Sequence, residues 1–178
     1  MSGHSKWSQI KHKKGATDAK RGQLFGKLVK EIAIAARSGS TDPAANARLR
    51  SALERAKDAG LPKENIARAI ARARGNGEGA ELSEILCEAA APGGIAIIIE
   101  AITDSKNRTV NEIKHILTEH NGKLAQPGSL LWNFERVGRH YKPRATVSPP
   151  EDRKKSLENL LSALSKQDDV QEIYTTIA

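Results

Sequence analysis

The stretch PGGIAIII, residues 92–99, decides how the second half of this 178-residue chain folds. Isoleucine stands at positions 95, 97, 98 and 99, so apolar side chains point to both faces of a strand. That pattern is typical of a central strand covered on both sides. The Pro-Gly-Gly run before it predicts a turn, and residues 82–90 before the turn predict a preceding strand.

Helical and strand patterns alternate downstream of this stretch. A helix is expected across residues 110–117, capped by Asp104 or Ser105 and ended by Asn121-Gly122, and leucines at 157, 160, 161 and 164 predict a second helix. Short strands are expected at 123–125 and 129–135, a last strand at 170–177, and irregular chain at 137–150, with Asp168-Asp169 as a solvated turn. Residues 76–178 therefore predict an α+β domain with a mainly antiparallel sheet and two helices.

Upstream of the strands, the apolar period is helical. One helix is predicted from Asp18 to Ala36 and stopped by Gly39, and a second begins with Asp42 as N-cap and proline at the first helical position. A third begins at Pro62 and is closed by Gly75. Residues 1–75 thus predict a small helical bundle with a basic arm at its start. Residues 75–80 are expected to form a hinge, and without a preceding strand or a following Lys-Ser/Thr they do not match a phosphate loop.

Charge divides the chain at the same place. Residues 1–75 carry 17 Lys and Arg against 6 Asp and Glu, a net charge of +11, whereas residues 76–178 carry 12 against 15, a net charge of −3. A basic front half indicates a polyanionic partner, because each phosphate that is neutralised releases condensed counterions. Nucleic acid is the polyanion that this pattern favours, although a solvated basic tail is the plainer alternative for the first residues.

The expected nucleic-acid-binding residues are cations of the arm and of the helix faces, with one aromatic side chain and one histidine among them. They are Lys6, Trp7, Lys11, His12, Lys13, Lys14, Lys20, Arg21, Lys27, Arg48, Arg55, Arg68 and Arg72. Arg68 and Arg72 lie four positions apart and share one helix face. Most arm cations are lysines, which favour phosphate positioning over base discrimination.

A second polar cluster spans residues 103–109. Helix capping explains it best, and the alternative is a second contact surface that comprises Lys106, Asn107 and Arg108. We favour the capping interpretation because these cations lie in the acidic half of the chain.

Catalytic and metal-binding patterns are absent from the sequence. His115 and His120 lie five apart instead of four, the single cysteine, Cys87, sits in a predicted strand, and no nucleophile motif occurs. We expect neither an enzyme, nor a metal, nor a cofactor. No apolar run reaches the length of a membrane span, so a cytoplasmic protein with no membrane partner is expected.

Several short motifs are distributed along nearly the whole chain. The opening holds GHSKW at 3–7, IKHKK at 10–14 and DAKRG at 18–22; later motifs are LPKENI at 61–66, PGG at 92–94, NRT at 107–109 and DDVQEIY at 168–174. Together they resemble the motifs of the YebC family, and the opening is the most specific of them. The resemblance implies a cytoplasmic, non-enzymatic regulator of transcription that binds DNA. Related proteins activate mitochondrial translation or act at the ribosome on proline runs, which implies ribosomal RNA as the alternative target.

Two departures from the family pattern stand out. Members usually carry a third domain inserted into the second, whereas here residues 136–150 form a short segment in its place. Thr175-Thr176 also stand where members tend to have Asn after the tyrosine. A protein–protein adaptor, with the basic face on an acidic partner, is a further alternative that the residues leave open.

Overall fold

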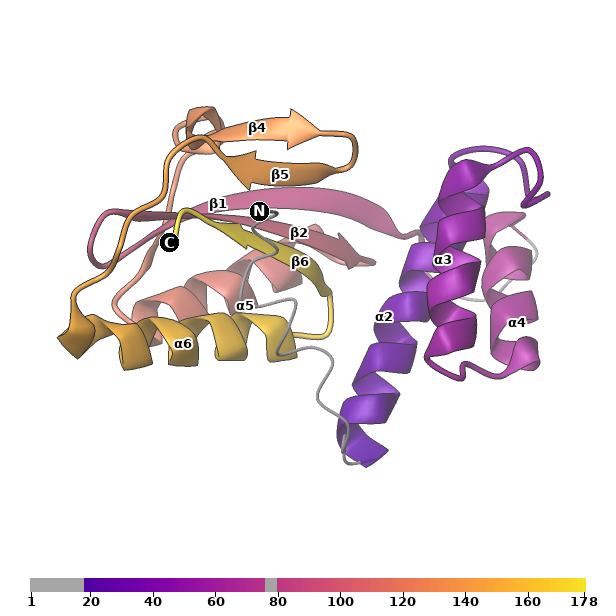
Figure 1. The fold of residues 1–178 in the computed structure, drawn as a ribbon. Coiled ribbons are helices and arrows are strands. Elements are labelled where there is room, and N and C mark those ends of the chain that lie inside the picture. Colours follow the sequence, from indigo (N-terminus) through magenta and orange to yellow (C-terminus); the bar gives the residue numbers. More distant parts are fainter. Residues whose placement is uncertain (1–17, 76–79) are drawn as a thin grey trace. The chain divides into compact units, whose positions relative to one another are not determined.

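The structure is a computed structural model that describes residues 18–75 and 80–178 (Figure 1). The described residues fall into two compact units. The helical unit extends to residue 85 and also includes residues 102–106, and the α+β unit comprises residues 86–101 and 107–178. The predicted fold class, a helical front half followed by an α+β part, is confirmed. Within the described residues, no helix is both long and apolar enough to cross a membrane.

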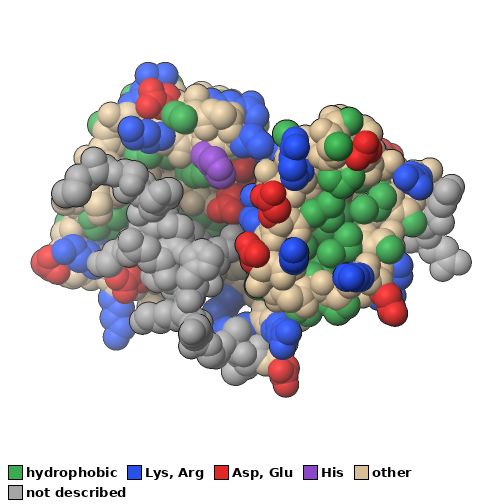
Figure 2. Space-filling model, turned by 45° about the vertical axis from the view of Figure 1, so that its right-hand side comes forward, with side chains coloured by type: hydrophobic (Ala, Val, Ile, Leu, Met, Phe, Trp, Pro, Cys, Tyr) green, Lys and Arg blue, Asp and Glu red, His purple; other side chains and the backbone are tan. Residues whose placement is uncertain are grey.

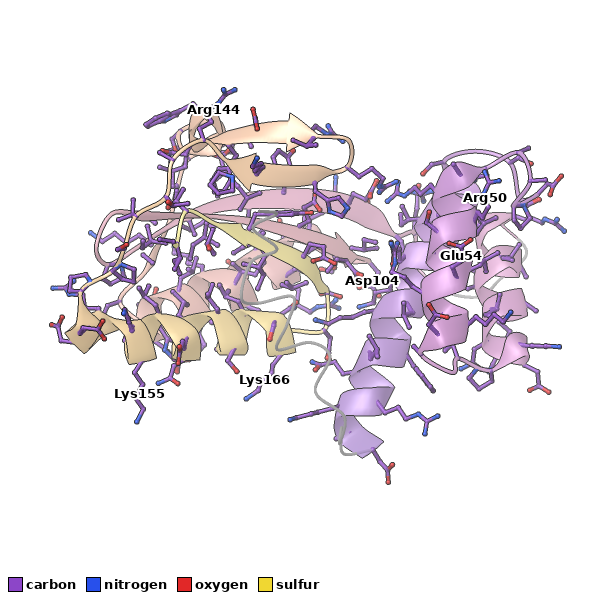
Figure 3. All side chains as sticks on the ribbon, in the orientation of Figure 1. Arg50, Glu54, Asp104, Arg144, Lys155 and Lys166 are labelled. Atoms are coloured by element: carbon purple, nitrogen blue, oxygen red, sulfur yellow. The ribbon has the colours of Figure 1, made fainter. Side chains whose placement is uncertain are left out.

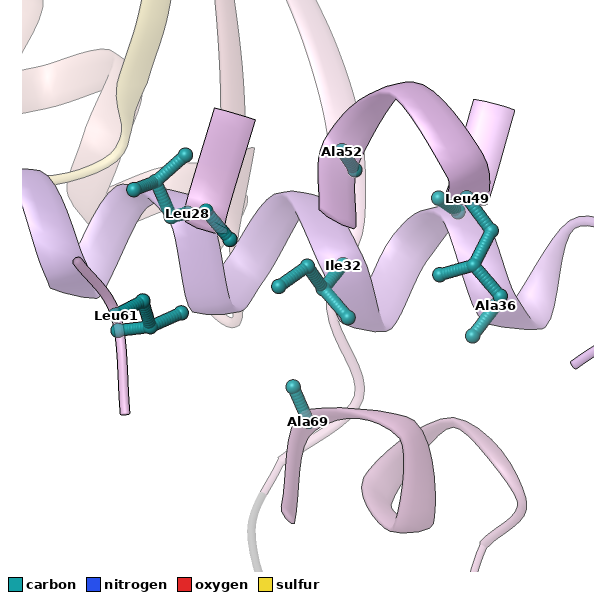
Figure 4. Packing of buried hydrophobic residues seen from close by; sticks show 9 residues of the cluster. Leu28, Ile32, Ala36, Leu49, Ala52, Leu61 and Ala69 are labelled. Carbon is teal, nitrogen blue, oxygen red and sulfur yellow. The ribbon is translucent and has the colours of Figure 1, made fainter. Parts of the chain in front are cut away.

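Three helices build the helical unit: α2 (Asp18–Arg37), α3 (Ala47–Asp58) and α4 (Lys63–Ala73). Their shared core is rich in alanine, which lets the helices approach closely. Its buried members are Leu28, Ile32, Ala35, Ala36, Leu49, Ala52, Ala56, Leu61 and Ala69. Figure 4 shows Ile32 of α2 lying between Ala52 of α3 and Ala69 of α4. Gly60 and Gly75, both with φ of 75°, end α3 and α4, and the role of Gly75 agrees with the sequence prediction.

The predicted start of α3 was wrong by four residues. Asp42 caps only a local turn, in which its carboxylate accepts from the backbone N–H of Ala44 at 2.9 Å. The N-cap is Asn46, whose side-chain oxygen accepts from the N–H of Leu49 at 3.0 Å. Its amide nitrogen also donates to the carbonyl of Ala35 at 2.8 Å, which ties the start of α3 to the end of α2. Buried Asn46 therefore both caps one helix and fixes its position on another.

Four strands form the main sheet: β1 (Ser83–Ala91), β2 (Ile95–Thr103), β3 (Lys123–Leu124) and β6 (Val170–Thr175), in the order β3-β1-β2-β6. β3 is antiparallel to β1, and β6 is antiparallel to β2. The turn between β1 and β2 contains Gly93 and Gly94, both with positive φ, as the Pro-Gly-Gly sequence predicted. The predicted central position of the isoleucine-rich strand is confirmed.

Both faces of β2 are covered. Helices α5 (Lys106–Glu119) and α6 (Glu151–Lys166) lie on one face of the sheet, and α6 contributes the four buried leucines that the sequence predicted (Figure 1). On the other face, Ala96 and Ile98 pack against buried Phe134. Tyr174 of β6 packs beside this cluster and donates to Glu100 at 3.2 Å. Burial, together with the charge of Glu100, raises the pKa of Tyr174.

The segment from 129 to 150 differs from its prediction. Instead of a strand at 129–135, the chain forms a 3-10 turn, η1 (Leu131–Asn133), followed by β4 (Phe134–Val137). β5 (His140–Pro143) then lies in residues expected to be irregular, and it pairs antiparallel with β4 as a two-stranded sheet. The pattern was missed because these short strands carry mainly polar and charged side chains instead of alternating apolar ones.

A buried carboxylate holds the chain just before β4. Glu88 of β1 is 3% exposed and accepts backbone N–H groups from Gly128, from Leu130 at 2.6 Å and from Leu131 at 2.9 Å. Three backbone donors on one carboxylate compensate for its loss of water. η1 is thereby fixed to the main sheet.

Candidate nucleic-acid interface

Six of the predicted binding residues belong to the arm: Lys6, Trp7, Lys11, His12, Lys13 and Lys14. They lie outside the described residues, as does most of the expected hinge at 75–80. Their roles stay sequence-based predictions, and the described cations can be judged on their geometry.

The described helices keep a strong excess of positive charge. Residues 18–75 carry 13 Lys and Arg and 6 Asp and Glu, a net charge of +7. On the face that Figure 2 shows, the blue Lys and Arg side chains of this unit are spread around hydrophobic surface instead of forming one dense patch. The unit thus presents a broad, positively charged surface, which suits phosphate contacts along a backbone better than a single anion pocket.

The predicted residues of α2 lie in its first three turns. Lys20 and Arg21 are exposed, and Lys27 is half-buried. The guanidinium carbon of Arg21 lies 5.3 Å from the ring centroid of Phe25. This cation–π contact orients the side chain without neutralising its charge, so Arg21 remains able to bind a phosphate.

The two predicted arginines of α3 bind carboxylates of the same unit. Arg48 forms a two-pronged ion pair with Glu84 at the start of β1, and Arg55 pairs with Glu31 of α2. These pairs compensate part of the positive charge at both positions. Since one partner in each pair is about half exposed, each contributes little to stability, and both arginines are weaker candidates than an unpaired cation.

The two predicted arginines of α4 have neutral partners. Arg68 donates to the side-chain oxygen of Asn65 at 2.6 Å, and Arg72 donates to the carbonyl of Ala80 at 2.6 Å. Arg72 is half-buried and holds the chain that follows the helix, whereas Arg68 is exposed. Arg68 therefore keeps its full charge at the surface. Although Arg68 and Arg72 were expected to bind nucleic acid from one helix face, Arg72 has a structural role and only Arg68 of the two is available for a ligand.

Sequence reasoning missed several exposed cations. Arg50, Lys57 and Lys63 are exposed, and none of them forms an ion pair with another described residue. Arg50 and Glu54 lie one turn apart on the exposed side of α3 (Figure 3), and Lys57 follows at the next turn of the same face. Counting cations on the face opposite the apolar stripe would have identified Arg50 and Lys57.

The alternative second surface loses its central cation. Lys106 and Asn107 are exposed at the start of α5, but Arg108 donates to the carboxylate of Asp169 at 3.0 Å. The side chain of Asp169 is 3% exposed and that of Arg108 is 48% exposed. The geometry favours a structural role for Arg108, as partner of Asp169, whereas the helix-capping interpretation of residues 103–109 stays a prediction.

The predicted solvated turn at Asp168-Asp169 was wrong for Asp169, which is buried, whereas Asp168 is exposed. Asp169 is 2% exposed, and its carboxylate also accepts from the hydroxyl of Thr109 at 2.6 Å. Gln167 completes the arrangement, because its side-chain oxygen accepts the N–H groups of Asp169 at 2.7 Å and Val170 at 2.9 Å. The cluster joins the start of α5 to the turn before β6 through buried hydrogen bonds.

No arrangement for catalysis or metal binding emerges in residues 18–75 and 80–178. No group of three or more His, Cys, Asp or Glu side chains there is placed to hold a metal ion. Cys87 is buried in β1, and burial raises the pKa of its thiol, which disfavours the reactive thiolate.

Known proteins match this chain closely. Residues 5–76 match the sequence profile of the "TACO1/YebC protein N-terminal domain", and residues 82–141 match that of the "TACO1/YebC second and third domain". A "Probable transcriptional regulatory protein" of Petrotoga mobilis is 55% identical over 138 residues, which are 78% of this chain and 55% of the relative. One from Chlorobium phaeobacteroides is 50% identical over 95% of this chain and 68% of its own length.

A solved structure extends the match to three dimensions. The "Conserved Hypothetical Protein Aq1575" of Aquifex aeolicus is 33% identical, with a TM-score of 0.89 over 98% of this chain and 97% of the other. The chain spans 55% to 60% of the length of three of the curated relatives that it matches. With both profiles matched in order along 132 of its 178 residues, the chain belongs to the TACO1/YebC family.

Proposed function

We propose that this protein is a non-enzymatic regulator of gene expression that binds nucleic acid through its helical unit and N-terminal arm. The observation that carries the proposal is the net charge of +7 on residues 18–75, which stays positive when the carboxylates that pair with Arg37, Arg48 and Arg55 within the same unit are counted. The name that these relatives carry, "Probable transcriptional regulatory protein", supports the same class.

Binding would act mainly through phosphates. The cations are spread over three helices, so several of them can follow a backbone, whereas base reading needs donors concentrated at one groove-entering element. Lys20, Arg21 and Arg68 are the described residues best placed for this role among those predicted. They are exposed and have no described carboxylate partner. Duplex DNA is the proposed target.

Folded ribosomal RNA is the second candidate. Phosphate positions and shape dominate its recognition, so a lysine-rich arm serves there as well as on duplex DNA. Aromatic residues make up 3% of the chain, which argues against a fold that reads many unstacked bases. The adaptor alternative is disfavoured because exposed cations lie on all three helices of the helical unit. They are not gathered into one site that would match a single acidic protein.

The proposal also covers domain organisation. We place the boundary at residues 75/76 and regard residues 136–150 as a short segment in place of an inserted third domain. The profile described as "second and third domain" matches this chain only over residues 82–141, which is consistent with a shortened region. The cytoplasmic location stays a prediction.

Crosslinking in cells, followed by sequencing of the bound nucleic acid, tests the proposal and separates its two targets. Recovery of duplex DNA supports transcriptional regulation, and recovery of ribosomal RNA supports the translational alternative. A variant with Lys20→Gln, Arg21→Gln and Arg68→Gln should recover several-fold less. A variant with Lys114→Gln, Lys123→Gln and Lys155→Gln, three exposed lysines of the α+β unit, is the matched control. Equal recovery for both variants would contradict a role for the helical unit.

A further inference from the structure

One small element of the α+β unit carries an excess of positive charge. Residues 86–101 and 107–178 carry 11 Lys and Arg and 11 Asp and Glu, so the unit as a whole is neutral. Within it, residues 134–144 carry four cations and one carboxylate, a net charge of +3, which leaves −3 for the remainder. This segment is the β4–β5 hairpin and the residue after it. In Figure 2, Lys and Arg side chains gather at the top of the unit, where Figure 1 places the hairpin.

An exposed tryptophan lies in η1, the 3-10 turn that leads directly into β4. Trp132 of η1 is 69% exposed, the largest exposure among the large hydrophobic side chains of the described residues. Its indole N–H donates to the carbonyl of Ser129 at 2.8 Å, so the ring is held in place although it faces solvent. Because the ring is already held in place, a base could stack on its exposed face with little further loss of side-chain conformational entropy.

The hairpin holds two arginines in defined orientations. Arg136 donates from Nε to the carbonyl of Gly138 at 3.3 Å and lies over the ring of Tyr141, 6.0 Å from its centroid. Arg144 donates from Nε to the carbonyl of Phe134 at 3.2 Å. Both bonds use the Nε group and leave the Nη donors, which match a phosphate in a bidentate manner.

Two further cations have no partner of this kind. Arg139 lies in the turn and Lys142 on β5, and both are exposed with no ion pair to another described residue. Glu135 is opposite Lys142 in the ladder and offsets part of its charge. The backbone N–H of Arg144 donates to the carbonyl of Asn133 at 2.8 Å, which places Arg144 at the same end of the hairpin as Trp132. Figure 3 shows Arg144 at that end.

We propose that Trp132 and the β4–β5 hairpin form a second contact surface that binds single-stranded nucleic acid, with a base stacked on Trp132 and the phosphates on Arg136, Arg139, Lys142 and Arg144. This inference rests on the proposed nucleic-acid-binding function and adds a strand preference to it. A protein partner fits less well, because Val137, the exposed large hydrophobic residue of the hairpin, lies at the end opposite to Trp132 and is separated from it along the hairpin.

Tryptophan fluorescence tests the proposal directly, because the chain has only two tryptophans. In a Trp7→Phe background the signal comes from Trp132 alone. Titration with oligo-dT and oligo-U of about 12 nucleotides, a length within the usual site sizes of single-strand-binding folds, should quench it. The two oligomers distinguish DNA from RNA as the strand. Trp132→Leu should weaken binding by about 5- to 100-fold.

Cation variants separate this surface from the helical unit. Arg139→Gln/Lys142→Gln should weaken oligomer binding and flatten the slope of log K against log salt by about 1.4, from about 0.7 per phosphate on single strands. It should leave duplex binding unchanged. The control Lys114→Gln/Lys155→Gln removes the same amount of charge from the same unit. It should change neither the oligomer affinity nor the slope of log K against log salt. Duplex binding without quenching, or equal effects of the two variants, would overturn the second surface alone. No binding to any nucleic acid would overturn the proposed function with it.

Discussion

Arg108 and Asp169 are separated by 60 intervening residues, yet a guanidinium nitrogen of Arg108 lies 3.0 Å from a carboxylate oxygen of Asp169. The pair joins the first turn of α5 to the turn before β6. A cation that the sequence offered as a possible contact for nucleic acid therefore has a defined structural partner. This pair favours a structural role for Arg108 over a role in ligand binding.

Replacing Asp169 by Asn should destabilise the protein. The substitution keeps the volume but removes the negative charge that strengthens the hydrogen bonds from Arg108 and Thr109, and it replaces one acceptor oxygen by an N–H₂ donor. We expect the free energy of unfolding to fall by about 1–3 kcal/mol in urea denaturation. Glu158→Gln, at an exposed position of α6, is the control and should stay within about 0.5 kcal/mol of wild type. If Asp169→Asn left the free energy of unfolding unchanged, the hydrogen-bond network would contribute nothing to stability.

Nucleic-acid affinity, unlike stability, should depend little on the Arg108–Asp169 pair. Arg108→Gln is expected to lower stability and to leave duplex affinity within about two-fold of wild type once the protein is folded, because its charge is already compensated by Asp169. Filter binding below the onset of unfolding measures it. A loss as large as that of the Lys20, Arg21 and Arg68 variant would move the second surface at Lys106–Arg108 ahead of the structural interpretation.

Replacing Glu88 by Gln should loosen η1. The amide group would point an N–H₂ donor at backbone N–H groups that now share one carboxylate. We expect a loss of about 1–3 kcal/mol in unfolding free energy. Hydrogen exchange at Leu130 and Leu131 should accelerate more than exchange in β2, and uniform exchange rates would argue against a local clamp.

Asn46 and Asp42 offer a matched comparison of the two candidate caps. Asn46→Ala removes the N-cap of α3 and two bonds to neighbouring carbonyls, and should cost about 2 kcal/mol or more. Asp42→Ala removes one exposed turn bond and should cost about 0.5 kcal/mol. Thermal unfolding of the two variants measures both losses of stability. A larger loss for Asp42→Ala than for Asn46→Ala would identify Asp42 as the N-cap.

Alkaline pH should destabilise the fold through Tyr174. Burial raises its pKa in the folded state above the ordinary value of about 10, so the folded protein holds this proton more tightly than the unfolded chain. The stabilisation is complete below about pH 10 and is lost as pH rises above it, by up to about 1.4 kcal/mol per pH unit. Tyr174→Phe should show a shallower decline above pH 10 in urea titrations, and parallel curves would contradict the assignment.

The predictable part of this fold was the part with strong periodicity. The predictions were correct for the helices around Ile32, Leu49 and Leu160 and for the isoleucine-rich strand β2. Each of these elements buries a continuous apolar face, which is visible in the sequence as a periodic pattern. The start of α3 was misplaced because Asp-Pro and Asn46 are both acceptable caps, and only the reach of Asn46 to Ala35 of the preceding helix decides between them.

The candidate site was less predictable, for a physical reason. Net charge is visible in a sequence, but the partners of Arg48 and Arg55 lie 36 and 24 positions away, and only the folded chain brings them together. The β4–β5 hairpin was missed since its cations alternate with few apolar residues. Its regular structure depends on Phe134 and Tyr141 packing on the main sheet.

A salt titration of duplex binding tests the central claim, phosphate binding by the basic front half, most directly. Wild type is compared with Lys11→Ala/Lys13→Ala/Lys14→Ala and with the Lys114→Gln/Lys123→Gln/Lys155→Gln control. If about five cations reach phosphates, log K should fall against log salt with a slope of about −4 to −5, and the arm variant should flatten it by about 3. The control should retain the wild-type slope. A slope that is the same in all three proteins would contradict the account.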